Sequence, residues 1–125
     1  MEERKHTEQF ARDNREIARA RHVVTNTLRS WGIDVEAPVL ALLVSELVTN
    51  ALIHGTGPIQ VHLTSDALRI RLEVTDHDGT PSAPHVVSHD RPGGWGLQLV
   101  DHLADDWGVA GPNHTTLVWT ETLRL

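Results

Sequence analysis

The hydrophobic pattern of this chain is strongest between residues 38 and 54, where apolar side chains recur at helical spacing. The recurring positions are Leu40, Leu43, Val44, Leu47, Val48, Ala51 and Leu52. Pro38 suits the first turn of a helix, because its missing N–H would have no intrahelical partner there. Gly55 and Gly57 follow the pattern and are expected to end the helix. We therefore predict a long apolar helix over residues 38–54.

The remaining pattern predicts further helices and strands. In chain order the predicted elements are helices at residues 10–31 and 38–54, strands at 58–64 and 68–75, a helix at 94–104, and strands at 107–109 and 116–123. Both longer strand segments alternate apolar and polar residues, as a strand with one buried face does. Residues 80–94 are rich in proline and glycine, and a loop of this length in a small domain is usually functional or disordered. Residues 1–9 are polar and are expected to be disordered.

This order of elements predicts the fold class. Helices and antiparallel strands that segregate in this way are typical of an α+β, two-layer sandwich, with helices on one face of a mixed, mostly antiparallel sheet. The 125 residues are long enough for one domain with a core of its own, so residues 1–125 are expected to form a single domain.

Composition narrows the function classes. The net charge of −6 argues against direct nucleic-acid binding, because such proteins are usually basic. The chain has no cysteine, which fits a cytoplasmic location, and its polar N-terminus does not resemble a signal peptide. No apolar run approaches the roughly 20 residues of a membrane span. The nine histidines are scattered without metal-ligand spacing.

The apolar helix carries two polar side chains on one side. Glu46 and Asn50 are four residues apart and share a face, and His54 lies roughly one turn further along. Taken alone, such a pair is typical of a solvated stripe. On the first helix, four arginines form a basic side, which is either a solvated face or a surface for an acidic partner. These arginines are Arg12, Arg15, Arg19 and Arg21.

Two further segments are candidates for ligand contacts. Gly93, Gly94 and Gly96 precede a helix, where glycines and free backbone N–H groups can approach a phosphate closely, although glycines also make plain turns. No Gly-Lys-Ser/Thr of a Walker A loop occurs. Asp76 ends a predicted strand and either initiates a turn or accepts a hydrogen bond from an exocyclic amine.

In this order the segments resemble the GHKL superfamily of ATP-binding domains, which have the Bergerat fold. Residues 46–55 match the N-box, residues 74–79 occupy the G1 box, residues 94–100 match the G2 box, and residues 115–118 fall where the last motif is expected. The match covers nearly the whole chain from Phe10. Within the superfamily the chain most closely resembles the small stand-alone anti-sigma-factor serine kinases of bacteria, the actinobacterial members in particular.

The resemblance implies a role for each matched residue. Asn50 would hold Mg²⁺, Glu46 would polarise the attacking hydroxyl, and Asp76 would read the adenine amine. Residues 80–93 would form a lid over the phosphates. The other residues implied to contact ATP are His54, Gly79, Gly94, Trp95, Gly96, Leu97 and Thr116.

The resemblance also implies partners, with one alternative left open. An enzyme of this type would phosphorylate a STAS-type anti-sigma antagonist and regulate a sigma factor, and a homodimer is plausible. The alternative is a catalytically weak or inactive nucleotide-binding switch. Two departures bear on this choice. Asp78 stands where the G1 box usually has glycine, and His114 precedes the last motif, so that either Thr115 or Thr116 could be the matching threonine.

Overall fold

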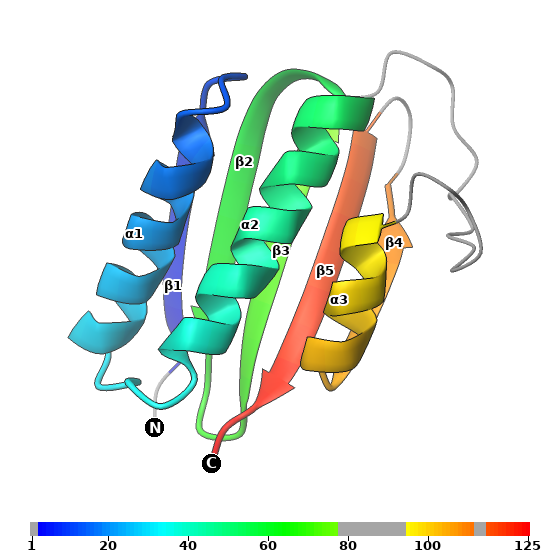
Figure 1. The fold of residues 1–125 in the computed structure, drawn as a ribbon. Helices are drawn as coiled ribbons and strands as arrows, with labels where there is room; N and C mark the ends of the chain where they lie inside the picture. The colour runs from blue at the N-terminus through cyan, green and yellow to red at the C-terminus, as the bar shows by residue number, and fades with distance from the viewer. Residues whose placement is uncertain (1–2, 78–94, 112–114) are drawn as a thin grey trace.

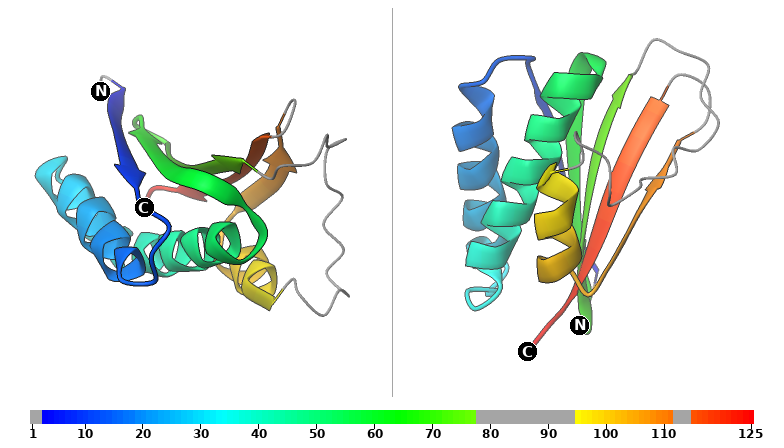
Figure 2. Two further views of the ribbon diagram at one scale, coloured as in Figure 1. Left: turned by 90° about the horizontal axis from the view of Figure 1, so that it is seen from above. Right: turned by 45° about the vertical axis from the view of Figure 1, so that its right-hand side comes forward.

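The computed structural model describes residues 3–77, 95–111 and 115–125. Its elements are β1 (Arg4–Phe10), α1 (Glu16–Ser30), α2 (Ala37–His54), β2 (Thr56–Ser65), β3 (Arg69–His77), α3 (Trp95–Leu103), β4 (Asp106–Ala110) and β5 (Thr115–Leu123). The strands form one sheet in the order β1-β2-β3-β5-β4, with every neighbouring pair antiparallel. The helices cover one face of this sheet in a single layer (Figures 1 and 2). The predicted α+β two-layer sandwich is confirmed.

Helix α2 is the central element of the helical layer. It contacts α1 on one side and α3 on the other, and it lies over β2 and β3 (Figure 1). Its seven buried residues are Ala37, Leu40, Leu43, Val44, Leu47, Val48 and Ala51. Among the described helices, α2 alone is long and apolar enough to cross a membrane, a test that buried core helices also pass. Its apolar residues here build the core against the inner face of the sheet.

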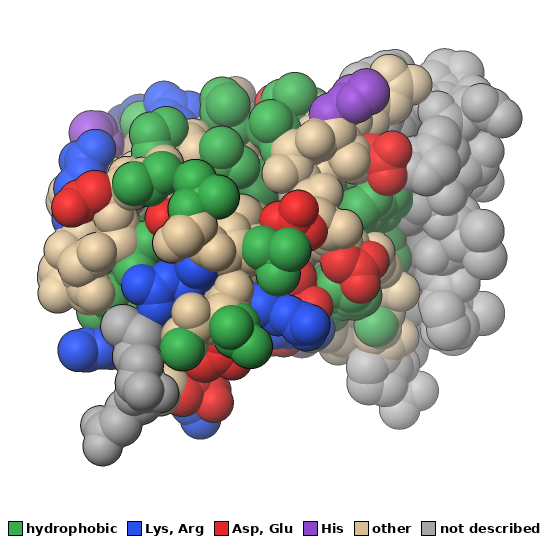
Figure 3. Space-filling view, turned by 90° about the horizontal axis from the view of Figure 1, so that it is seen from below, with side chains coloured by type: hydrophobic (Ala, Val, Ile, Leu, Met, Phe, Trp, Pro, Cys, Tyr) green, Lys and Arg blue, Asp and Glu red, His purple; other side chains and the backbone are tan. Residues whose placement is uncertain are grey.

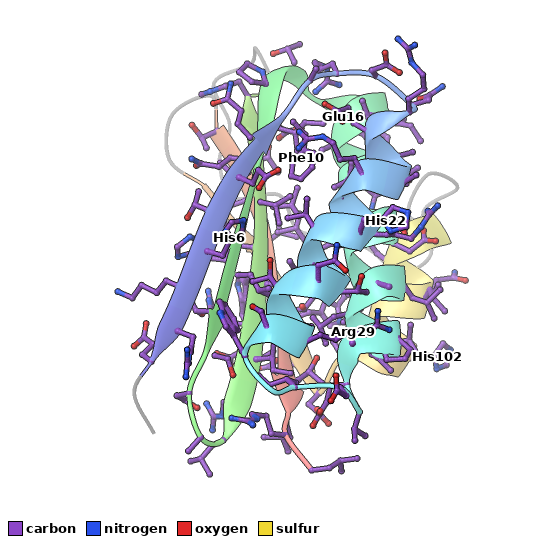
Figure 4. All side chains as sticks on the ribbon, turned by 90° about the vertical axis from the view of Figure 1, so that its left-hand side faces the viewer. His6, Phe10, Glu16, His22, Arg29 and His102 are labelled. Carbon is purple, nitrogen blue, oxygen red and sulfur yellow. The ribbon has the colours of Figure 1, made fainter. Side chains whose placement is uncertain are left out.

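The expectation that residues 1–9 lack regular structure is wrong from Arg4 onward, because Arg4–Phe10 forms the edge strand β1. It pairs with β2 in a continuous register from Arg4 opposite Ser65 to Phe10 opposite Ile59. An edge strand needs one apolar anchor and can otherwise stay polar, so its hydrophobic pattern is weak. Phe10 is that anchor: it is 1% exposed and lies between β1 and α1 (Figure 4). It therefore ends a strand and does not begin a helix.

Two of the four arginines that were expected to give the first helix a basic side pair with nearby carboxylates. Arg19 pairs with Glu16 at 2.6 Å and Glu8 at 2.5 Å, and its guanidinium lies 4.2 Å from the centre of the Phe10 ring. Arg15 donates to Asp13 at 2.6 Å, and these hydrogen bonds lower the pKa of Asp13 to about 2. These two arginines therefore do not form a free positive surface for an acidic partner.

The two ends of the molecule differ in character. The end that holds the C-terminus exposes several large apolar side chains among charged ones (Figure 3). They are Val35, Leu68, Leu123 and Leu125. At this end the backbone amide of Leu125 donates a hydrogen bond to the buried Glu36 carboxylate at 2.8 Å. Helix α2 runs from this end to the opposite one, where its last turn meets the ends of the inner strands (Figure 1).

Candidate functional site

The polar residues singled out in the sequence lie around the C-terminal half of α2. Helix α2 ends near the end of β3, which pairs with the start of β5, and α3 begins beside α2 further from that end (Figure 1). Segments that are far apart in the chain therefore meet at one end of the sandwich.

Glu46 and Asn50 lie on one side of α2, and both are partly exposed. They are four positions apart in a continuous helix, so the two side chains are neighbours on its surface. The Asn50 Nδ2 atom is buried and has no hydrogen-bond partner among the described residues. Because a buried amide nitrogen is normally paired, this atom marks a place where a ligand could complete the structure. His54 is exposed in the last turn of the helix.

Gly55 brings the end of α2 into close contact with Asp76. A Cβ atom on Gly55 would lie 1.6 Å from Asp76 Oδ2 and 2.4 Å from Cγ, so only glycine leaves room for this carboxylate. Gly55 has φ −106° and ψ −176°, which is extended backbone that any residue adopts. It was expected as a helix-ending glycine, but the requirement for glycine here is space and not backbone conformation. Asp76 itself is 4% exposed on the inner face of the sheet.

The strand register decides which threonine accompanies Asp76. Asp76 is directly opposite Thr116 in β5, whereas Thr115 is opposite His77. Directly opposite residues of an antiparallel pair point to the same face, so Thr116 lies on the inner face with Asp76. His77 is exposed, and Thr115 shares its outer face. The predicted site residue Thr116 is thus beside Asp76, and Thr115 is not.

The start of β2 is irregular where it pairs with the end of β3. The register shifts between Thr56 and Gln60, and Gly57 has φ +71°, a left-handed conformation that favours glycine. The Thr56 hydroxyl donates to the His77 carbonyl at 2.7 Å. Together these features hold the turn after α2 against the strand that carries Asp76.

Helix α3 supplies the last described part of the site. Trp95 and Gly96 are its first two residues. Leu97 is 8% exposed and belongs to the hydrophobic core with Val100, so it anchors the start of α3 against α2. Gly79, Gly94 and the predicted lid at residues 80–93 lie outside the described residues, as do Asp78 and His114.

The site contains the buried carboxylate of Asp76, the side-chain amide of Asn50 and the partly exposed carboxylate of Glu46. Asp76 can accept a hydrogen bond from a donor on a ligand, and Glu46 can take a proton from a hydroxyl. Within the described parts of the chain, no three His, Asp or Glu side chains gather as a metal site. A Mg²⁺ ion held by one protein oxygen and by substrate phosphates needs no such cluster.

Sequence reasoning did not place Arg12 at this region, although the residue contacts it. Arg12 fits the helical spacing of the arginines, but it lies in the connection between β1 and α1. Its guanidinium reaches the end of α2, 39 and 40 positions along the chain. Periodicity reports neighbours on one element, so it could not have shown a contact between a loop and a distant helix end.

Comparison with known proteins agrees with this geometry. The family model of the histidine kinase-like ATPase domain matches residues 10–120. The match spans every described residue of the site, from the end of β1 to β5. No curated protein matched the chain.

Proposed function

Because the chain belongs to the family of histidine kinase-like ATPase domains, we propose that it is an ATP-dependent serine/threonine protein kinase that phosphorylates an anti-sigma antagonist. ATP binding and kinase-like activity follow from the family. The serine/threonine specificity and the regulation of a sigma factor are the finer part of the proposal. The observation that carries it is that Glu46 and Asn50 lie one turn apart on a partly exposed side of α2, the helix whose end approaches Asp76 at Gly55.

The described residues fit ATP with Mg²⁺. The Asn50 Nδ2 atom, which has no partner among the described residues, and the space that Gly55 leaves for Asp76 are both features that a bound nucleotide would explain. Asp76 would accept a hydrogen bond from the adenine amine, with Thr116 beside it. Asn50 would hold the metal through its amide oxygen, and Mg²⁺, when bound, would neutralise charge on the phosphates.

Glu46 would act on the acceptor hydroxyl of the protein substrate. Its carboxylate lies one turn before Asn50, so a hydroxyl directed at the terminal phosphate would come within its reach. Glu46 would orient this hydroxyl and take its proton as the oxygen bonds to the γ-phosphorus, while the bond from that phosphorus to the β–γ bridging oxygen breaks and ADP leaves. In this family most of the catalytic effect would come from positioning and charge neutralisation, as in other phosphoryl transfers.

The proposed partners are a STAS-type anti-sigma antagonist as substrate, a sigma factor as regulated partner and a second copy of the chain in a homodimer, all in the cytoplasm. The test is transfer of the labelled γ-phosphate of ATP to a purified antagonist in the presence of Mg²⁺. Phosphoserine or phosphothreonine on the antagonist supports the proposal. Capture of the sigma factor with ATP bound but without transfer to any cognate antagonist supports a nucleotide-dependent switch in its place.

Replacing Asn50 by alanine should remove the gain in ATP affinity that Mg²⁺ provides, because the proposed oxygen ligand is lost. The fold should persist, since the side chain is partly exposed and lies beside the core. Titration of ATP with and without Mg²⁺ measures the effect. Thr49→Ala is the matched control, because among the described residues the Thr49 hydroxyl bonds to the Ser45 carbonyl of the same helix and to nothing else. A full Mg²⁺ effect in Asn50→Ala would show that Asn50 is not the ligand.

Replacing Asp76 by asparagine should narrow the preference for ATP over GTP by about one to two orders of magnitude. A carboxylate accepts from the adenine amine but repels the guanine carbonyl at the same edge, whereas an amide can donate to that carbonyl. Equilibrium titration with both nucleotides gives the ratio. If the ratio stays the same, Asp76 does not contact the base.

A further inference from the structure

Arg12 joins the connection between β1 and α1 to the C-terminal end of α2. Its Nη2 atom donates to the carbonyl oxygens of Ala51 and Leu52, each at 2.7 Å. Its Nη1 atom lies 3.4 Å from the carbonyl oxygen of Gly57, at the start of β2. One guanidinium therefore bridges the last turn of the helix and the strand that follows it.

Two of these carbonyls, those of Ala51 and Leu52, belong to the last four C=O groups of α2. Such groups lie beyond the regular hydrogen-bond ladder of a helix and carry the negative end of its dipole. Ala51 O also accepts the Gly55 amide, at 2.9 Å. No carboxylate in residues 3–77, 95–111 or 115–125 pairs with Arg12, so within these residues its charge is directed at the helix end.

The connection that presents Arg12 is itself held in place. The Ala11 amide donates to Glu16 Oε1 at 3.2 Å, and the Arg15 amide donates to Asp13 Oδ1 at 2.8 Å. Arg12 thus extends from a defined turn between β1 and α1. Its planar fork lets Nη2 donate to the two helix carbonyls while Nη1 reaches Gly57, whereas a lysine ammonium would bring one nitrogen for all three contacts.

The turn that Arg12 holds is the one that faces Asp76. Gly55 follows directly on this turn, and its backbone lies so close to the Asp76 carboxylate that no Cβ atom fits between them. A shift of the helix end by a fraction of an ångström would change the space around that carboxylate. Within the described residues, the hydrogen bonds of Arg12 all go to backbone carbonyl oxygens and not to the Asp76 carboxylate.

We propose that Arg12 is a positioning residue of the nucleotide site, which fixes the last turn of α2 so that Asp76 is held in the geometry that selects adenine. This inference rests on the proposed function, in which Asp76 receives the base. The β1–α1 connection would then contribute to base selectivity, because it holds the C-terminal end of α2 through Arg12.

The test compares Arg12→Ala with Arg15→Ala. Arg15 lies in the same connection, but its side chain is 90% exposed and, in the part of the chain that the structure describes, it pairs with Asp13 alone, which makes it a matched control. Arg12→Ala should weaken ATP binding about tenfold and lower the ratio of ATP affinity to GTP affinity. Arg15→Ala should leave both quantities unchanged. Exchange of the Gly55 amide proton should become faster in Arg12→Ala without nucleotide, because the turn opens more easily. Arg12→Lys should recover part of each effect.

The outcomes separate this inference from the proposed function. If Asp76→Asn changes the ATP/GTP ratio and Arg12→Ala does not, Arg12 has no positioning role although the base pocket stands. If Asp76→Asn leaves the ratio unchanged, the assignment of the base pocket fails, and faster Gly55 exchange alone would then show only that Arg12 holds the helix end. A lower melting temperature with an unchanged ratio would also overturn the inference. Should Arg12→Ala fail to fold, an unchanged ratio in the milder Arg12→Gln variant decides against it.

Discussion

Phosphate transfer by the Glu46→Gln variant is expected to fall by about 10²–10⁴-fold, the usual contribution of a positioned acid–base group. The amide keeps the size and polarity of the side chain but cannot take a proton from the acceptor hydroxyl. ATP affinity should change little, because the proposed nucleotide contacts belong to Asn50 and Asp76. Single-turnover transfer to the antagonist, measured beside ATP titration, separates the two effects.

The matched control is Glu73→Gln, since Glu73 lies on the outer face of β3 and bonds to Arg71 at 2.7 Å. This variant should transfer phosphate at the normal rate. Equal rates for Glu46→Gln and the unaltered protein would remove Glu46 from the chemical step. If the unaltered protein also transfers nothing yet binds ATP and its sigma factor, the protein is a switch and not a kinase.

Much of the fold follows from the sequence because the inner elements have strong patterns. Helix α2 was predicted at residues 38–54 and spans Ala37–His54, since its apolar spacing reflects burial against the sheet. The strand β1 was missed because an edge strand can be polar at nearly every position, and six of its seven residues are polar or charged. The pairing with β2 that stabilises it is a long-range contact, which a local pattern does not report.

In the candidate site, too, the sequence predicts neighbours within one element but not contacts between elements. Glu46 and Asn50 could be grouped from their spacing, because both lie on one helix. The approach of Gly55 to Asp76 joins a helix end to a strand end, and no local pattern encodes that distance. The choice between Thr115 and Thr116 likewise needed the register of β5 against β3, because a shift of one residue exchanges the two faces of a strand.

Replacing Gly55 by alanine is expected to lower ATP affinity on the order of 10²-fold, the size of effect that a displacement of about 1 Å can have at a site. The new Cβ atom would lie 1.6 Å from Asp76 Oδ2 and 3.0 Å from the Ala51 carbonyl oxygen. Either the carboxylate must leave its position or the end of α2 must move away from β3. Both movements change the proposed base contact, and the overpacking should also lower the free energy of unfolding by about 1–3 kcal/mol.

Gly32→Ala provides the control that separates lost stability from a lost site. Gly32 has φ +79° and no atom within 4 Å of an added Cβ, so alanine there introduces backbone strain of about 1–2 kcal/mol without a clash. The two variants should therefore lose similar stability by thermal unfolding, while only Gly55→Ala loses ATP affinity. If Gly55→Ala binds ATP as Gly32→Ala does, the carboxylate can move without consequence, and the contact between Gly55 and Asp76 does not shape the nucleotide site.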